Sequence, residues 1–242
     1  MLNRGDLGLR LDVTYYDTDI VELERKVCEL SPLKLKDLAK YVSSGATPLT
    51  SERDKYYTDK ENGIPFIRVQ NLQETGELSL EDTNFINYTT HNELLNRSQV
   101  KEGDLLIKIT GVGRMAVASV APKGFEGNIN QHIVLIKTGN TYTSELIAAF
   151  LNTDIGEKLA SRRATGGTRP ALDYPALLSI PIVLDDRILN LSKASRTQKQ
   201  QKEAETAQIL SNIDNYLLDH LGIAKTTAET DMESRIFILI FV

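Results

Sequence analysis

The sequence predicts an α+β protein, in which a globular mixed domain is followed by a long projecting C-terminal helix that pairs like a coiled coil. Two observations support this prediction. Between residues 64 and 136, short apolar runs are bounded by Gly, Pro or Asn, a pattern typical of strands. From Asp186 to Leu221 the chain has no Gly and no Pro and is rich in Gln, Lys, Glu and Ala, as expected of one long helix.

Individual elements follow from local patterns. Apolar runs predict strands at residues 64–69, 104–109, 117–120, 132–136 and 178–184. Helix formers occupy Val21 to Leu30, and apolar residues recur on one side of a helix over 144–159. Loops are expected at 43–48 and 166–170. We therefore divide the chain into a domain at 1–185, a helix at 186–222 and a tail at 223–242.

The long helix carries an apolar stripe over its C-terminal half. A helix of this length spans roughly 50 Å, which is too long for the interior of the same domain. We therefore expect it to project and to pack on a partner along that stripe. Gly222 is expected to end the helix, and the apolar run at 236–242 is expected to pair with a partner that the sequence does not identify. The stripe consists of Ala204, Ala207, Leu210, Ile213, Leu217 and Leu221.

Composition sets limits on the class of protein. A chain of 242 residues with 41% hydrophobic and 25% charged residues is typical of a folded globular protein, which excludes wholesale disorder. The single cysteine, Cys28, excludes a disulfide framework and a Cys-rich zinc site. No apolar stretch follows Met1, and the longest apolar run is about a third of a membrane span. These features predict a cytoplasmic protein.

Charge is distributed unevenly along the chain. The net charge of −5 argues against binding of nucleic acid by bulk electrostatics. Residues 97–137, however, hold six basic and three acidic side chains, and residues 155–202 hold nine and four. Residues 203–233 hold one basic and seven acidic side chains. Local basic faces therefore remain available for an acidic partner.

A glycine motif at Thr110–Ala116 matches the fingerprint G-x-G-x-x-A of dinucleotide-binding proteins. That site requires a helix directly after the motif, whereas the β-rich segment at 117–122 follows here and ends in proline. A tight hairpin-like turn is therefore the favoured interpretation. The rival hypothesis is a nucleotide-cofactor-binding enzyme that uses the Gly111-Val112-Gly113 turn and Ala116.

Polar residues next to predicted loops are candidates for binding. The run Asn130-Gln131-His132 offers amides of the kind that hydrogen-bond to adenine in the major groove. His132 is also a candidate catalytic base, but no nucleophile motif accompanies it, so a polar cluster at a strand edge is favoured. Arg162, Arg163 and Arg169 flank Gly166-Gly167, where glycine allows close approach of the backbone to a phosphate. The residues alone indicate a non-enzymatic binding domain on a helical arm.

The order of these segments resembles the specificity (S) subunit of type I restriction-modification systems. The resemblance covers residues 10 to 184 and is followed by the long helix. Each segment is weak evidence alone, and the set in this order is specific. The matching segments are Arg10-Leu11-Asp12 with Tyr15-Tyr16, Ser44 to Pro48, Gly63 to Arg68, Asn71-Leu72, Gly103 to Ile107, Gly111-Val112-Gly113, Asn130 to Ile133, Phe150-Leu151-Asn152, Gly166 to Leu172 and Ile180-Pro181-Ile182.

The resemblance implies a function in DNA recognition. A full specificity subunit holds two target-recognition domains and two helices, and this chain matches one of each. It would read half of a bipartite double-stranded DNA target and dock methyltransferase subunits, through which a nuclease/translocase subunit acts. S-adenosylmethionine, ATP and Mg belong to those partners, so no cofactor and no catalytic residue is expected here. A homodimer through the long helix, or pairing with a second specificity half, would restore the full shape.

The basic blocks and the resemblance together suggest the DNA-binding residues. For Lys193, Arg196 and Lys199 on the long helix, a solvated face is favoured over contact with phosphate or methyltransferase. A third hypothesis is a scaffold that retains only assembly through the helix. The predicted DNA-binding residues are Arg68, Lys108, Arg114, Gln131, Arg162, Arg163 and Arg169.

Overall fold

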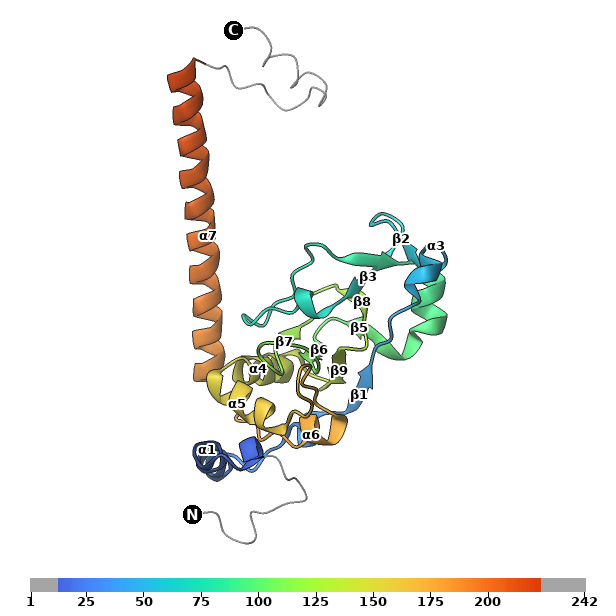
Figure 1. The fold of residues 1–242 in the computed structure, drawn as a ribbon, viewed down its shortest axis with the longest axis vertical. Helices are drawn as coiled ribbons and strands as arrows, with labels where there is room; N and C mark the ends of the chain where they lie inside the picture. Colours follow the sequence, from blue (N-terminus) through green and yellow to red (C-terminus); the bar gives the residue numbers. More distant parts are fainter. Residues whose placement is uncertain (1–12, 223–242) are drawn as a thin grey trace. The chain divides into compact units, whose positions relative to one another are not determined.

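The computed structural model describes residues 13–222, which form an α+β fold, as predicted (Figure 1). Contacts along the chain divide it into two units at Ser195 and Arg196. The first unit contains both sheets and the shorter helices, and the second contains most of the last helix. The predicted boundary at residue 185 stays a prediction. The Arg10-Leu11-Asp12 segment and the tail at 223–242 lie outside the described residues.

The first sheet has four antiparallel strands in the order β1-β9-β6-β7. Three of them lie at predicted strands, whereas β1 enters the expected loop at 43–48, so that this loop begins at Gly45. In β9, Val134 and Ile136 face one side of the sheet and Ile133 and Leu135 face the other, as a period of two requires. The strands are β1 (Tyr41–Ser44), β6 (Leu105–Lys108), β7 (Ala118–Val120) and β9 (Ile133–Lys137).

The second sheet has five strands in the order β2-β4-β3-β8-β5. Its central pair, β3 and β8, is parallel, and the other pairs are antiparallel. Pro65 lies in β3, where it faces Phe85 of the neighbouring strand. The strands are β2 (Tyr57–Thr58), β3 (Ile64–Ile67), β4 (Asn84–Ile86), β5 (Gln99–Lys101) and β8 (Glu126–Ile129).

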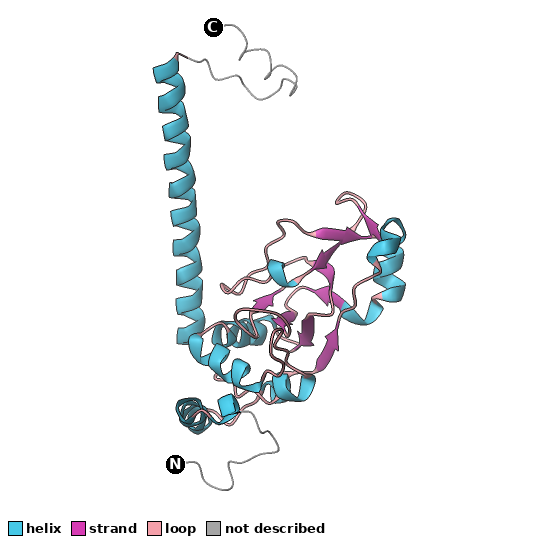
Figure 2. Cartoon of the chain, viewed as in Figure 1, coloured by secondary structure: helices cyan, strands magenta, loops and turns pink. Residues whose placement is uncertain are grey.

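The domain has three layers, with the four-stranded sheet between helices and the five-stranded sheet. Leu105 and Ile107 of β6 pack with Ile147 of a covering helix. Leu106, from the opposite face of the same strand, packs with Ile129 of β8. Figure 2 shows helices and strands largely segregated in this way. The covering helices are α1 (Thr18–Leu30), α2 (Leu35–Leu38), α4 (Thr141–Leu151), α5 (Asp154–Arg163) and α6 (Tyr174–Leu178).

The predicted single helix at 144–159 is two helices, so that prediction was wrong. Helix α4 ends at Leu151 because the Asn152 amide pairs with the backbone of Ala118, donating to its carbonyl (2.8 Å) and accepting from its N–H (2.9 Å). Thr153 then caps α5 by accepting from the Gly156 N–H at 3.0 Å. The break places α4 against β7 and starts α5 in a new direction.

The predicted strand at 178–184 is also wrong. Pro175 lies in the first turn of α6, which includes Leu178. The following residues form an isolated bridge in which Pro181 faces Lys34. Flanking hydrogen bonds join Leu35 N–H to Ile180 O and Ile182 N–H to Leu33 O, each 2.9 Å. Proline has no N–H to extend this pairing into a sheet.

The last helix, α7 (Asp186–Leu221), has the predicted extent. Its first turns belong to the first unit, where Leu189 is buried with Leu146 and Ala149 of α4. Gly222, at φ +67°, follows its last residue, as the sequence predicted. In the second unit the predicted stripe is exposed at Leu210, Ile213, Leu217 and Leu221. Among residues 13–222, no helix is long and apolar enough to cross a bilayer.

The shorter elements lie between these helices and strands, and η3 and α3 connect the first sheet to the second. They are η2 (Val13–Tyr16), η3 (Thr50–Glu52), α3 (Arg53–Tyr56), η4 (Val69–Asn71), η5 (Thr90–Leu94) and η6 (Asn96–Ser98). The amide of Asn71 ties η4 to the following loop, because it accepts from the Arg68 N–H at 2.8 Å and donates to Ser79 O at 2.9 Å. Asn71, which belongs to one of the segments that carry the resemblance, therefore stabilises the fold.

Candidate nucleic-acid interface

Four loops that are distant in sequence converge at one end of the four-stranded sheet. We call them the loop cluster: residues 45–49 after β1, 109–117 between β6 and β7, 130–132 between β8 and β9, and 165–172 between α5 and α6. Antiparallel pairing explains this, because β1 and β6 end where β7 and β9 begin. The loop cluster thus contains the three motifs that the sequence suggested for binding, which are Thr110–Ala116, Asn130-Gln131-His132 and Gly166-Gly167.

Backbone hydrogen bonds hold these loops together. Ile109 N–H donates to His132 O at 3.0 Å, and Ile109 O accepts from Leu172 N–H at 2.8 Å. Gly111 N–H donates to Pro170 O at 3.2 Å. Gly45 approaches β8 so closely that a Cβ at this position would lie 1.7 Å from Ile129 O, so that only glycine fits. The cluster is a connected surface and its geometry is fixed by the backbone.

The Gly-x-Gly motif lies in the connection between β6 and β7, which confirms the hairpin-like interpretation, but this connection runs over residues 109–117 and is not the tight turn that the sequence predicted. The two strands are antiparallel, and no helix opens after the motif. Gly111 and Gly113 have φ values of +120° and +82°, which favour glycine, and Ala116 adopts +54°. The context that a dinucleotide site needs at this motif is therefore missing from the described structure.

Lys108 ends β6 directly beneath this turn. Its side chain is buried, and Nζ donates to Val112 O at 2.7 Å. Burial lowers the pKa of Lys108, and the charge of Glu74 partly opposes this shift. An ammonium group held in this way stabilises the turn and is not available to bind a phosphate outside it.

Arg114 lies within the loop cluster and Arg68 beside it, and the side chains of both form contacts with neighbouring residues. Arg114 Nη1 pairs with Asp154 at 2.9 Å, and Nη2 donates to Asn152 O at 3.0 Å. Arg68 follows Ile67, whose carbonyl accepts from Asn130 N–H. Its Nη2 donates to Asp82 O at 2.7 Å, and its buried Nε has no partner among the described residues. Both residues are partly exposed.

Gln131 and Arg169 are exposed within the loop cluster. The Gln131 amide oxygen accepts a hydrogen bond from Thr47 Oγ1, which orients the amide. Thr47 was not predicted as a site residue, since it lies 84 positions away in sequence. Arg169 is at the tip of the Gly166–Pro170 loop. An oriented amide and an exposed guanidinium are the side chains that read adenine and bind guanine or phosphate.

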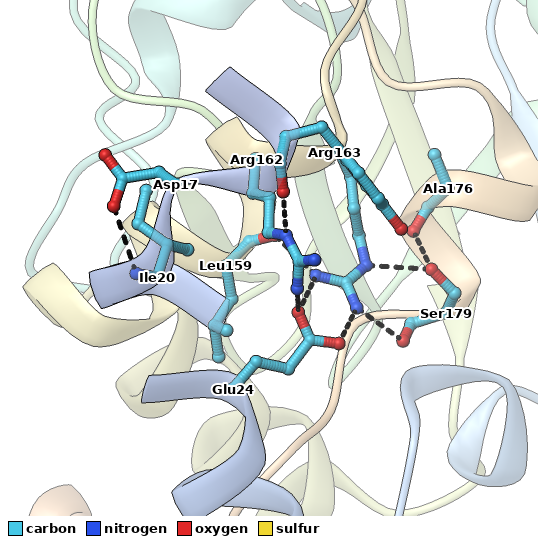
Figure 3. Close-up of polar contacts among 9 residues, drawn as sticks. Asp17, Ile20, Glu24, Leu159, Arg162, Arg163, Ala176 and Ser179 are labelled. Atoms are coloured by element: carbon cyan, nitrogen blue, oxygen red, sulfur yellow. Dashed lines mark hydrogen bonds and ion pairs between the residues drawn. The ribbon is translucent and has the colours of Figure 1, made fainter. Parts of the chain in front are cut away.

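Arg162 and Arg163 instead form a buried ion-pair network with Glu24 of α1 (Figure 3). Arg163 Nη2 lies 2.5 Å from Glu24 Oε1, and its Nε donates to Ser179 Oγ at 2.9 Å. Arg162 donates to Tyr15 O at 2.7 Å and lies over the Tyr15 ring. The two side chains are 9% and 8% exposed. These contacts favour a structural role for both arginines, and we do not retain them in the proposed DNA surface.

On α7, Lys193 Nζ pairs with Glu145 of α4 at 2.7 Å, which fixes the start of the helix. Lys199 lies 3.6 Å from Glu203 on the same helix. These ion pairs are consistent with the interpretation that the lysines belong to a solvated face of the helix.

The described residues offer little for metal or cofactor chemistry. His, Cys, Asp and Glu side chains within residues 13–222 form no group of three that could hold a metal ion. His132 is half-buried, and its backbone N–H donates to Asn130 Oδ1 at 3.1 Å. Recognition through hydrogen bonds and charge is the chemistry that the loop cluster offers best.

Comparisons with known proteins support the fold. No family model matches the chain, and no curated protein matches it in sequence. Among solved structures, the type IIG restriction endonuclease BpuSI matches with a TM-score of 0.56 and 10% identity, over 74% of this chain and 28% of that one. The type I restriction-modification S subunit from M. genitalium gives a TM-score of 0.45 and 11% identity, over 78% and 43%. A chain of a type I R-M system gives 0.44 and 16%, over 85% and 51%.

The chain spans about half or less of the length of these proteins. The match to BpuSI shows a shared fold. The resemblance in sequence predicted a fold of restriction-modification proteins, and that prediction is confirmed at the level of the fold.

Proposed function

We propose that the chain is a non-catalytic DNA-recognition subunit of a type I restriction-modification complex and that it reads half of a bipartite target. One observation carries this proposal: loops distant in sequence converge on one rigid surface that presents an oriented amide and an exposed guanidinium, Gln131 and Arg169. The shared fold with a restriction enzyme supports the same function.

The proposed DNA surface comprises the loop cluster, which includes Arg114, together with Arg68 beside it. Its few accessible cations predict modest affinity for DNA alone, because affinity follows the number of phosphates neutralised. Sequence is read by contacts to base edges. Docking of methyltransferase subunits, and action of a nuclease subunit through them, are part of the proposal, and their cofactors would remain with those subunits.

The proposal includes pairing of the α7 apolar stripe with a second copy or a second specificity half. Four large apolar side chains of the stripe are exposed in the single chain, and a helix that leaves such a stripe open needs a partner. Self-pairing would give a symmetric, interrupted target.

Selection from a pool of randomised DNA duplexes tests the proposed function. The full chain should enrich one or two short conserved blocks, and the double variant Gln131→Ala, Arg169→Ala should lose the enrichment while melting at the same temperature. Val13→Ala, an exposed substitution in η2, is the matched control and should enrich the same blocks. Absence of enrichment by the unmodified chain, or unchanged enrichment by the double variant, would contradict the proposal.

A further inference from the structure

The turn between β6 and β7 presents one apolar side chain at its tip. Val112 is 77% exposed, and Gly113 beside it has no side chain. The residues at either base of the turn are buried: Ile109 on one side, Met115 and Ala116 on the other. The turn thus displays a single isopropyl group within the loop cluster.

Two hydrogen bonds and one ion pair hold the tip of this turn in place. The buried Lys108 ammonium donates to the Val112 carbonyl, Gly111 N–H donates to Pro170 O, and Arg114 pairs with Asp154. Lys108 is 7% exposed, and burial of an ammonium is costly unless it is hydrogen-bonded. Ala116 at φ +54° adds a sparsely populated backbone conformation. A single exposed valine is common on protein surfaces and needs no explanation. Here, however, a costly buried charge holds the turn that displays the valine, and this arrangement suggests a function for the side chain.

The chemistry of valine limits what this tip can recognise. An isopropyl group has no donor or acceptor, so it gains nothing from phosphates or from polar base edges. In the major groove, the apolar group that a base pair presents is the 5-methyl group of thymine. We propose that Val112 is a specificity-determining residue that contacts a thymine methyl group, and that Lys108 is a positioning residue that fixes the Val112 backbone. This inference rests on the proposed DNA-recognition function.

Replacement of thymine by uracil tests the contact directly, because it removes only the methyl group. The duplex selected by the full chain is prepared with deoxyuridine in place of each thymidine in turn. The unmodified chain should bind one substituted duplex about 4-fold more weakly, the effect of about 0.8 kcal/mol for one buried carbon. Val112→Ala should bind the thymine and uracil forms equally at that position. Val13→Ala, an exposed valine outside the loop cluster, should discriminate like the unmodified chain.

Lys108→Met separates a positioning role from direct contact with phosphate. A positioning role predicts loss of the thymine discrimination with an unchanged slope of log affinity against log salt. A phosphate contact predicts a slope smaller by about one, with discrimination retained. Thermal melting followed by circular dichroism checks that each variant is folded.

The outcomes distinguish this inference from the function on which it rests. If the unmodified chain selects no sequence, the proposed function and the inference both fail. If it selects a sequence but no deoxyuridine position affects binding, or Val112→Ala still discriminates thymine from uracil, only the assignment of Val112 fails. A smaller salt slope for Lys108→Met overturns the positioning role.

Discussion

Replacing Glu24 with Gln tests the role of the buried ion-pair network between α1 and α5. The carboxylate of Glu24 contacts both guanidinium groups and is only 20% exposed. Loss of one partner of a buried pair costs about 3–5 kcal/mol, because the remaining charge stays uncompensated. Arg162 and Arg163 keep hydrogen bonds to Tyr15 O and Ser179 Oγ, so we expect the lower end of this range. Glu24→Gln should therefore lower the free energy of unfolding by about 3 kcal/mol at pH 7.

Urea unfolding of the full chain, followed by circular dichroism, measures this change. Glu22→Gln is the matched control on the same helix, since Glu22 pairs with Arg25 and both side chains are exposed. It should leave the unfolding free energy nearly unchanged. A Glu24→Gln variant that is no less stable than Glu22→Gln would refute the assignment of a structural role to Arg162 and Arg163.

The pH dependence gives a second signature of this network. Burial raises the pKa of Glu24, but hydrogen bonds and charges from Arg163 and Arg162 outweigh burial and lower it below the ordinary value of 4.5. A lowered pKa in the folded state contributes stability that is present above pH 4.5 and is lost as the pH falls through the folded value. The difference in unfolding free energy between the unmodified chain and Glu24→Gln should therefore be full at neutral pH and shrink below pH 4.5.

Three further predictions concern the loop cluster and the last helix. Arg169→Glu should weaken binding to the selected duplex, with a salt slope smaller by about one and an unchanged melting temperature; unaltered affinity would remove Arg169 from the proposed surface. Gly45→Ala should cost about 3 kcal/mol of unfolding free energy, because its Cβ would overlap Ile129 O, whereas Gly167→Ala meets nothing within 4 Å and should be nearly neutral. By light scattering, the full chain should be a dimer and the chain truncated after Ser195, which keeps the buried Leu189 in the first unit, a monomer; equal oligomeric states would contradict pairing through α7.

Local patterns in the sequence predicted α1, four of the nine strands within residues 13–222 (β3, β6, β7 and β9) and the extent of α7, whereas the other five strands were not predicted. Strands such as β6 and β9 were predictable because short apolar runs end at Gly or Asn. The break between α4 and α5 was not, since it depends on a side-chain contact between Asn152 and Ala118, 34 residues apart. The wrong prediction of a strand at 178–184 has a similar cause. An apolar run with one proline is compatible with a strand and also with an isolated bridge, and the local pattern does not distinguish them.

The site was predictable only in part, because charge along the sequence does not show which cations are paired. Arg162 and Arg163 have the same local pattern as Arg169, yet their partner Glu24 lies 138 and 139 residues away. Lys108 ends an apolar strand, and the sequence did not indicate that its ammonium turns toward Val112. By contrast, the glycine and amide motifs were located correctly in loops: residues 111–113 follow β6, residues 130–132 follow β8 and residues 166–167 follow α5.

Hydrogen–deuterium exchange of the full chain with and without the selected duplex tests most directly whether the loop cluster recognises DNA. We expect slower exchange on DNA binding at residues 109–117, 130–132 and 165–172, and unchanged exchange in α1. Protection confined to segments outside the loop cluster, with these loops unaffected, would contradict this expectation.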